Sequence, residues 1–193
     1  MKGKWAIFLD RDGTISGDAG LVSVPEQLRL LPGAGAALRR LREAGALLIV
    51  VTNQPVVARD LVDEEGLGRI HRRLEELLAG EGASLDAIYY CPHHPETHHP
   101  EAADPRYRRV CGCRKPKPGM LLAAAERFGV DLARSFMVGD STRDVGAARA
   151  AGCRAVLVRT GSGGADGTCP DARPDATVDD LAGAADWILR NRE

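Results

Sequence analysis

The chain has 193 residues with 26 Lys or Arg and 27 Asp or Glu, and the resulting formal net charge of −1 argues against a general nucleic-acid binder. No apolar segment approaches the roughly 20 residues that cross a bilayer, and the apolar run after Lys4 is shorter than the core of a signal peptide. We therefore expect a single domain over residues 1–193 of a cytoplasmic monomer, with no nucleic-acid or membrane partner.

Short apolar segments alternate with helical patterns along the chain. The apolar segments predict buried strands at Trp5–Leu9, Leu47–Val51, Ala87–Tyr90, Phe136–Val138 and Ala155–Val158. The patterns between and after them predict helices over Gly33–Ala44, Leu67–Leu78, Pro118–Phe128, Asp144–Ala151 and Asp179–Arg190, the last with a capping box formed by Thr177 and Asp180. This alternation predicts an α/β fold: a mostly parallel central sheet between two helical layers, without a large cap domain. The stretch Gly161–Pro174 is predicted to be a surface loop.

Polar side chains follow the predicted strands at the edge where open parallel sheets bind ligands. Asp10 and Asp12 follow the first strand, and in extended chain their side chains project to the same side. Two neighbouring carboxylates are costly unless a cation or a proton separates their roles. Further polar groups follow the second and fourth strands, namely Thr52, Asn53, Gln54, Asp140 and Ser141.

These groups suit the hydrolysis of a phosphate ester. Mg²⁺ takes one or two carboxylates together with substrate phosphate and water, and Asp10, Asp140 and a backbone carbonyl near Asp12 can supply the protein ligands. Lys115 and Thr52 can hold the remaining phosphoryl oxygens. Asp10 would act as the nucleophile that forms an aspartyl-phosphate. Asp12 would protonate the leaving alcohol and later deprotonate the attacking water.

Four segments together resemble the motifs of a known superfamily. In order they are Asp10-x-Asp12-Gly13-Thr14, Thr52-Asn53, Lys115, and Gly139-Asp140 with Asp144 four residues later. They resemble the motifs of the haloacid dehalogenase superfamily of phosphohydrolases, and the resemblance implies a Rossmannoid fold and Mg²⁺ dependence. The second carboxylate at position 12 favours phosphatases over the dehalogenases proper. Each segment taken alone is also compatible with an ordinary solvated turn.

The cysteines and histidines gather in one short region that suggests a second metal. Two pairs can each lie on one side of an extended chain, Cys91 with His93 and Cys111 with Cys113. Four nitrogen and sulfur ligands suit a structural Zn²⁺, which would close a loop over about residues 91–113. The alternatives are a redox disulfide between Cys111 and Cys113, a surface histidine cluster, and His98 or His99 as the histidine ligand.

The segments around these pairs narrow the resemblance. Tyr89-Tyr90-Cys91-Pro92-His93-His94-Pro95 and Cys113-Arg114-Lys115-Pro116-Lys117-Pro118-Gly119-Met120 resemble the D-glycero-D-manno-heptose 1,7-bisphosphate 7-phosphatases. The resemblance implies removal of the 7-phosphate in the biosynthesis of nucleotide-activated heptose. It also implies that Thr52 and Lys115 stabilise the phosphoryl group. The implied substrate contacts are Asp18, Gly20, Thr52, Asn53, Gln54, Arg114, Lys115 and Ser141.

Other functions stay open at this point. The histidinol-phosphate phosphatases share the zinc loop and the catalytic motifs, and another small sugar phosphate is a further candidate substrate. A phosphatase for nucleic-acid ends lacks a basic track in this sequence. A zinc-binding scaffold without activity would leave the acidic motifs unexplained. Pro55-Val56-Val57 and Leu21 depart from the family pattern where substrate choice would be set.

Overall fold

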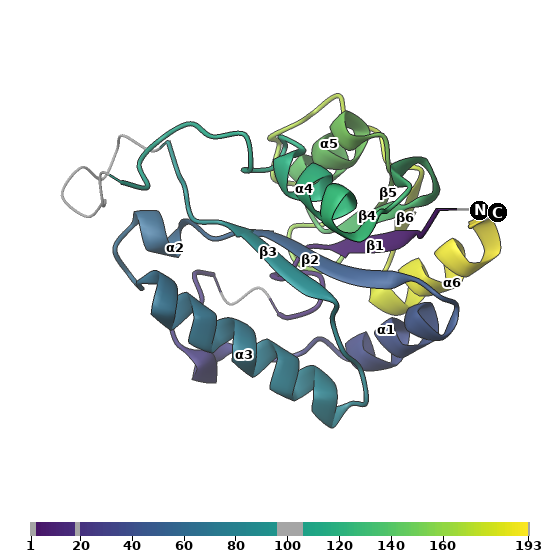
Figure 1. Cartoon of the computed structure of the whole chain (residues 1–193), viewed down its shortest axis with the longest axis horizontal. Coiled ribbons are helices and arrows are strands. Elements are labelled where there is room, and N and C mark those ends of the chain that lie inside the picture. The colour runs from purple at the N-terminus through teal and green to yellow at the C-terminus, as the bar shows by residue number, and fades with distance from the viewer. Residues whose placement is uncertain (1–2, 18–19, 96–105, 193) are drawn as a thin grey trace.

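A six-stranded sheet forms the centre of the molecule in the computed structural model, which describes residues 3–17, 20–95 and 106–192 (Figure 1). The strands lie in the order β3-β2-β1-β4-β5-β6, and every neighbouring pair is parallel. Their bounds are β1 (Ala6–Leu9), β2 (Leu47–Asn53), β3 (Ala87–Cys91), β4 (Phe136–Gly139), β5 (Arg154–Val158) and β6 (Ala176–Val178). The predicted parallel sheet is therefore confirmed.

Helices cover both faces of this sheet. Their bounds are α1 (Ala34–Glu43), α2 (Pro55–Ala58), α3 (Glu64–Gly80), α4 (Gly119–Phe128), α5 (Thr142–Ala151) and α6 (Leu181–Asn191), with short 3-10 helices η1 (Pro25–Gln27) and η3 (Leu132–Arg134). Helices α1, α3 and α6 pack on one face, and α4 and α5 pack on the other (Figure 1). The three-layer α/β architecture is the one that the alternating pattern predicts.

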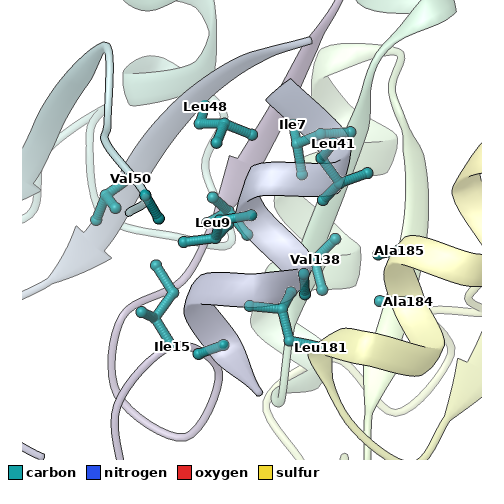
Figure 2. Close-up of a cluster of buried hydrophobic side chains, with 14 of the residues drawn as sticks. Ile7, Leu9, Ile15, Leu41, Leu48, Val50, Val138, Leu181, Ala184 and Ala185 are labelled. Carbon is teal, nitrogen blue, oxygen red and sulfur yellow. The ribbon is translucent and has the colours of Figure 1, made fainter. Parts of the chain in front are cut away.

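Two apolar clusters, one on each face, bury the sheet. Along β1, Ile7 and Leu9 belong to the cluster under α1 and α6 (Figure 2), whereas Ala6 and Phe8 belong to the cluster under α4 and α5. All four side chains are fully buried. Burial on both faces is what makes a parallel strand a continuous apolar run in the sequence.

Local details differ from the sequence-based expectations. Strand β6 is a short edge strand that is not fully buried, so no apolar run marks it. The other edge strand, β3, is also only partly buried before Cys91. The capping box with Thr177 is wrong, because Thr177 lies in β6. Instead, Asp180 caps α6 and accepts a hydrogen bond from the Gly183 amide at 2.8 Å.

The carboxyl ends of the central strands meet at one edge of the sheet. The chain leaves β1 towards β2 on one side and later returns to β4 on the other, so this edge is the topological switch point where such folds bind ligands. The amide of Asp10 donates to the carbonyl of Val138 at 2.9 Å, which fixes the start of the first loop against β4. In the described part of the chain, no helix has the length and apolar character of a membrane span.

Candidate active site and zinc centre

Three carboxylates and one buried ammonium group converge beyond β1 and β4. Oxygen atoms of Asp10, Asp140 and Asp144 all lie within 4.8 Å of one another. The Nζ atom of Lys115 lies 3.0 Å from Oδ1 of Asp10 and 2.6 Å from Oδ1 of Asp144, and its side chain is 0% exposed. The structure brings the predicted residues Asp10, Asp140 and Lys115 together, and it adds Asp144, which belonged to the fourth motif but was not among the predicted site residues.

The electrostatics of this cluster favour a divalent cation. Burial and the neighbouring charge of Asp10 raise the pKa of Asp140. Burial raises the pKa of Asp144 to about 7, against the opposing charge of Lys115. Burial opposes ionisation of Lys115 as well, but the carboxylates of Asp10 and Asp144 raise its pKa and keep it charged. When all four groups are ionised, three negative charges face one positive charge, and hard oxygen donors in this arrangement fit Mg²⁺.

The carboxylate of Asp12 is held separately from that cluster. Arg11 donates from Nε to Oδ1 at 2.9 Å and from Nη2 to Oδ2 at 2.6 Å, forming a bidentate pair. Gln54 adds a third hydrogen bond, from Nε2 to Oδ2 of Asp12 at 3.0 Å. The side chain of Arg11 is 0% exposed, whereas that of Asp12 is 25% exposed and lines the cavity described below. Arg11 was not among the predicted site residues, although its place between two carboxylates was visible.

The residues after β2 build one wall of the site. Thr52 is almost fully buried and accepts a hydrogen bond from Nε2 of Gln54 at 2.9 Å. Asn53 forms two hydrogen bonds with the backbone of Lys115, from Nδ2 to its carbonyl at 3.1 Å and from its amide to Oδ1 at 3.0 Å. Gln54 is also buried, and its Nε2 atom donates to both Asp12 and Thr52. Asn53 and Gln54 therefore orient their neighbours within the site.

A cavity of about 260 Å³ lies over these groups and is lined by both acidic and cationic side chains. The acidic ones are Asp10, Asp12 and Asp140, and the cationic ones are Arg114 and Arg143. Besides Arg114, three of the predicted substrate contacts line it, namely Gly20, Thr52 and Asn53. Asp18 lies outside the described residues, and Ser141 is buried beside the cavity with 1% of its surface exposed.

The loop after β5 completes the site, although no motif in the sequence indicates this role. Ser162 donates from its amide to Oδ2 of Asp140 at 2.6 Å and from its hydroxyl to the Asp140 carbonyl at 2.7 Å. Thr160 donates to the carbonyl of Gly13 at 2.6 Å. Gly13 has a φ of 76°, and a Cβ atom there would lie 2.5 Å from Oδ2 of Asp140. The predicted surface loop thus folds back and fixes the Asp140 carboxylate.

The four predicted zinc ligands form a second cluster. The three Sγ atoms lie 3.2–3.5 Å apart, and Nδ1 of His93 lies 3.7 Å from Sγ of Cys91 and 3.4 Å from Sγ of Cys113. These distances are far longer than the ~2.05 Å of a disulfide bond. They are close to the edges of roughly 3.5–3.8 Å that tetrahedral zinc with sulfur and nitrogen ligands requires.

This geometry decides between the alternatives for the cysteines. All three cysteines of the cluster are free thiols, so the structure contradicts the alternative of a Cys111–Cys113 disulfide. Burial raises the pKa of the Cys91 thiol, which therefore resists ionisation unless a cation is present. The Cys91, His93, Cys111 and Cys113 cluster fits a zinc site. His98 and His99 lie outside the described residues.

The zinc cluster is tied to the active site and to α3. Arg114, which directly follows Cys113, donates from Nη1 to the carbonyl of His93 at 3.1 Å. Glu64, at the start of α3, accepts hydrogen bonds from the hydroxyls of Tyr107 at 2.6 Å and Tyr90 at 2.9 Å. These two hydrogen bonds lower the pKa of Glu64. The loop is therefore anchored on both sides of the metal ligands.

The chain is similar to known phosphatases along most of its length. Residues 112–184 match the model of the HAD-hydrolase-like family. The D-glycero-D-manno-heptose-1,7-bisphosphate 7-phosphatase of Thermosynechococcus vestitus is 43% identical over 187 residues, which cover 95% of this chain and 94% of that protein. The D-glycero-beta-D-manno-heptose-1,7-bisphosphate 7-phosphatase of Escherichia coli K12 is 42% identical, with 96% and 88% covered.

Solved structures give the same relationship. The D,D-heptose 1,7-bisphosphate phosphatase from B. bronchiseptica, complexed with magnesium and phosphate, superposes with a TM-score of 0.81 at 39% identity. The superposition covers 97% of this chain and 99% of that one. A putative HAD-like phosphatase from Mesorhizobium loti superposes with a TM-score of 0.82 at 30% identity, with 98% and 87% covered.

Proposed function

Since the chain belongs to the haloacid dehalogenase-like family of phosphatases, alongside the heptose 1,7-bisphosphate 7-phosphatases, we propose that it hydrolyses the 7-phosphate of D-glycero-D-manno-heptose 1,7-bisphosphate. This reaction would serve the biosynthesis of nucleotide-activated heptose. The observation that carries the proposal is the convergence of Asp10, Asp140 and Lys115 beside a small cavity. The two arginines that line the same cavity, Arg114 and Arg143, suit a substrate with a second phosphate.

Mg²⁺ would be held by the carboxylates of Asp10 and Asp140 and by the backbone carbonyl of Asp12. When bound, it would neutralise oxygens of the phosphoryl group and reduce the repulsion that an attacking carboxylate meets. Asp144 is better suited to hold Lys115, because its Oδ1 pairs with Nζ and its Oδ2 accepts from the Ser141 amide at 3.1 Å. Lys115 then keeps a fixed positive charge beside the nucleophile.

In the first step, Asp10 attacks the phosphorus and the ester P–O bond breaks. Its Oδ1 is already held by the Arg11 amide at 2.7 Å and by Lys115, so Oδ2 is the oxygen that we assign as the nucleophile. Asp12 gives a proton to the departing alcohol. Thr52 accepts from Gln54, and its hydroxyl proton can therefore donate to a phosphoryl oxygen.

In the second step, water attacks the phosphorus of the aspartyl-phosphate. Asp12 takes a proton from this water, inorganic phosphate leaves, and the carboxylate of Asp10 is regenerated. The hydrogen bonds from Arg11 and Gln54 hold the Asp12 carboxylate in one place through both proton transfers. We also propose that the enzyme works as a cytoplasmic monomer without nucleic-acid or membrane partners, which gel filtration and cell fractionation can test.

The test is a ranking of substrates by kcat/KM in the presence of Mg²⁺, with the heptose bisphosphate, histidinol phosphate and other sugar phosphates. We expect the heptose bisphosphate to rank first. A higher value for histidinol phosphate would refute the proposed substrate. The Asp10→Asn variant should keep its circular dichroism spectrum and lose turnover, and it should take up no label from a substrate with a radioactive phosphate. Retained turnover would refute Asp10 as the nucleophile.

A further inference from the structure

Two cavities meet at the guanidinium groups of Arg114 and Arg143. One is the 260 Å³ cavity over the carboxylates, and the other is a neighbouring cavity of about 420 Å³ beside the zinc loop. Both arginines line both cavities. The second cavity is also lined by Arg109 and Lys117, and none of its described lining residues is acidic. The junction therefore carries positive charge without a matching carboxylate on the side of the second cavity.

Arg143 is held from one side only. Its Nε atom donates to Oγ of Ser141 at 2.7 Å and lies 3.8 Å from Oδ2 of Asp166. For its two Nη atoms, the structure records no partner in the described part of the chain. Its side chain is about one-third exposed (34%), at the boundary between the cavities. A guanidinium that is fixed at Nε and open at both Nη atoms can bind an oxyanion with two parallel hydrogen bonds.

The support beneath Arg143 is itself rigid. Asp166 is 6% exposed at its side chain and accepts a hydrogen bond from the Thr142 amide at 2.6 Å through Oδ1. Ser141 caps the start of α5, where its hydroxyl accepts from the Arg143 amide at 3.3 Å. Because Ser141 is buried and its hydroxyl is engaged with Arg143, its contribution to substrate binding is exerted through Arg143.

Arg114 reaches the same junction from the segment that follows the zinc-cluster residue Cys113. It is partly buried, and its Nη1 atom donates to the carbonyl of His93 at 3.1 Å. The zinc loop therefore fixes one guanidinium and the start of α5 fixes the other. Two like charges that share a cavity wall repel each other unless an anion lies between them. A phosphate group provides such an anion, and its oxygens match the planar donors of both arginines.

We propose that Arg143 is a specificity-determining residue that binds, together with Arg114, the phosphate that is not hydrolysed, and that Ser141 and Asp166 are its positioning residues. This inference rests on the proposed function, because it requires a substrate with two phosphates. The reacting phosphate lies at the acidic, metal-binding end of the cavity, and the second phosphate lies at the arginine junction. The site thereby selects bisphosphorylated over monophosphorylated sugars.

The test compares two substrates that react at the same position. D-glycero-D-manno-heptose 1,7-bisphosphate and the corresponding 7-phosphate differ only in the second phosphate. For Arg143→Gln we expect the ratio of kcat/KM for the bisphosphate to that for the monophosphate to fall about 10- to 100-fold, mainly through KM, because charge-assisted hydrogen bonds are lost. Arg143→Lys keeps the charge without the planar donor pair and should restore part of the ratio. Asp166→Asn should lower it less than Arg143→Gln.

A matched control comes from the same helix. Arg149 lies on α5, has a side chain that is 44% exposed, pairs with Asp175 and lines neither cavity. Arg149→Gln should keep the wild-type ratio. An equal loss on both substrates in the Arg143 variants, or an unchanged ratio, would overturn the inference alone. Failure of the wild-type protein on both heptose phosphates would overturn the proposed function, and this inference with it.

Discussion

His71 should make the stability of this protein depend on pH in the range just below neutrality. It lies on the inner face of α3, is 7% exposed and has no hydrogen-bond partner at Nε2 among the residues that the structure describes. Its ring packs against Tyr90 with the ring centroids 5.5 Å apart. Burial, and then the positive charge of Arg11, lower its pKa from 6.5 to about 3. The folded protein therefore keeps this imidazole neutral where the unfolded chain would protonate it.

The size of the effect follows from the two pKa values. Because the folded pKa is the lower one, the unfolded chain binds the extra proton, and the free energy of unfolding falls as the pH drops below 6.5. The loss amounts to about 1.4 kcal/mol for each pH unit and continues until the folded pKa is reached. At pH 5 it should amount to about 2 kcal/mol relative to pH 8, because pH 5 is roughly 1.5 units below the unfolded pKa.

The assay is urea unfolding of the wild-type protein and of His71→Gln at pH 5, 6, 7 and 8. The substitution removes the ring contact with Tyr90, so the variant should be less stable at pH 8 by about 1 kcal/mol. That deficit should shrink and then reverse as the pH falls, since the variant has no imidazole to protonate. The pH dependence that comes from zinc release and from the carboxylates is the same in both proteins, so it cancels in the difference between their unfolding free energies. Arg72→Gln, an exposed substitution on the same helix, should follow the wild-type curve. Parallel curves for wild type and His71→Gln would refute the reasoning.

Three further perturbations test the active site and the zinc loop. Lys115→Met leaves the buried carboxylate of Asp144 without its cation, so unfolding measurements should show a loss of about 3–5 kcal/mol, and turnover should disappear; unchanged stability would contradict the buried ion pair. Cys113→Ser should lower the zinc content found by metal analysis and lower the Tm, and a full zinc complement would contradict its role as a ligand. Gly13→Ala places a Cβ atom 2.5 Å from Oδ2 of Asp140 at a φ of 76°. We expect the free energy of unfolding to fall by at least about 1 kcal/mol and kcat to fall as well. Near-wild-type values of both would show that the loop can move aside and would contradict the prediction.

The fold was predictable where burial on both faces leaves an unbroken apolar run. Strands β1, β2 and β4 are central, and their sequences show this directly. The edge strand β6 has three residues of mixed exposure, so its sequence carries no strand signal. Helix α2, Pro55–Ala58, is a single turn after a proline, too short for a helical period.

The site was predictable where a catalytic residue directly follows a strand, and less so where its partner comes from a loop. Asp10 and Asp140 follow β1 and β4, so topology alone brings them together. The contact of Ser162 with Asp140 spans 22 residues and depends on the turns of an irregular loop. Arg11 is adjacent to Asp12 in the sequence, but only the structure shows that its side chain turns inward and is fully buried.

The three consecutive residues Cys113, Arg114 and Lys115 link the zinc cluster to the candidate active site. The first belongs to the cluster that fits zinc, the second lines the cavity of the candidate active site, and the third carries the buried ammonium group beside Asp10. A loop has few apolar contacts that could hold such a segment. If Lys115 were displaced, however, the buried carboxylates would lose their counter-charge. The zinc cluster on one side and the two hydrogen bonds with Asn53 on the other would fix the segment without a core of its own. We therefore expect loss of zinc to weaken catalysis by displacing Lys115.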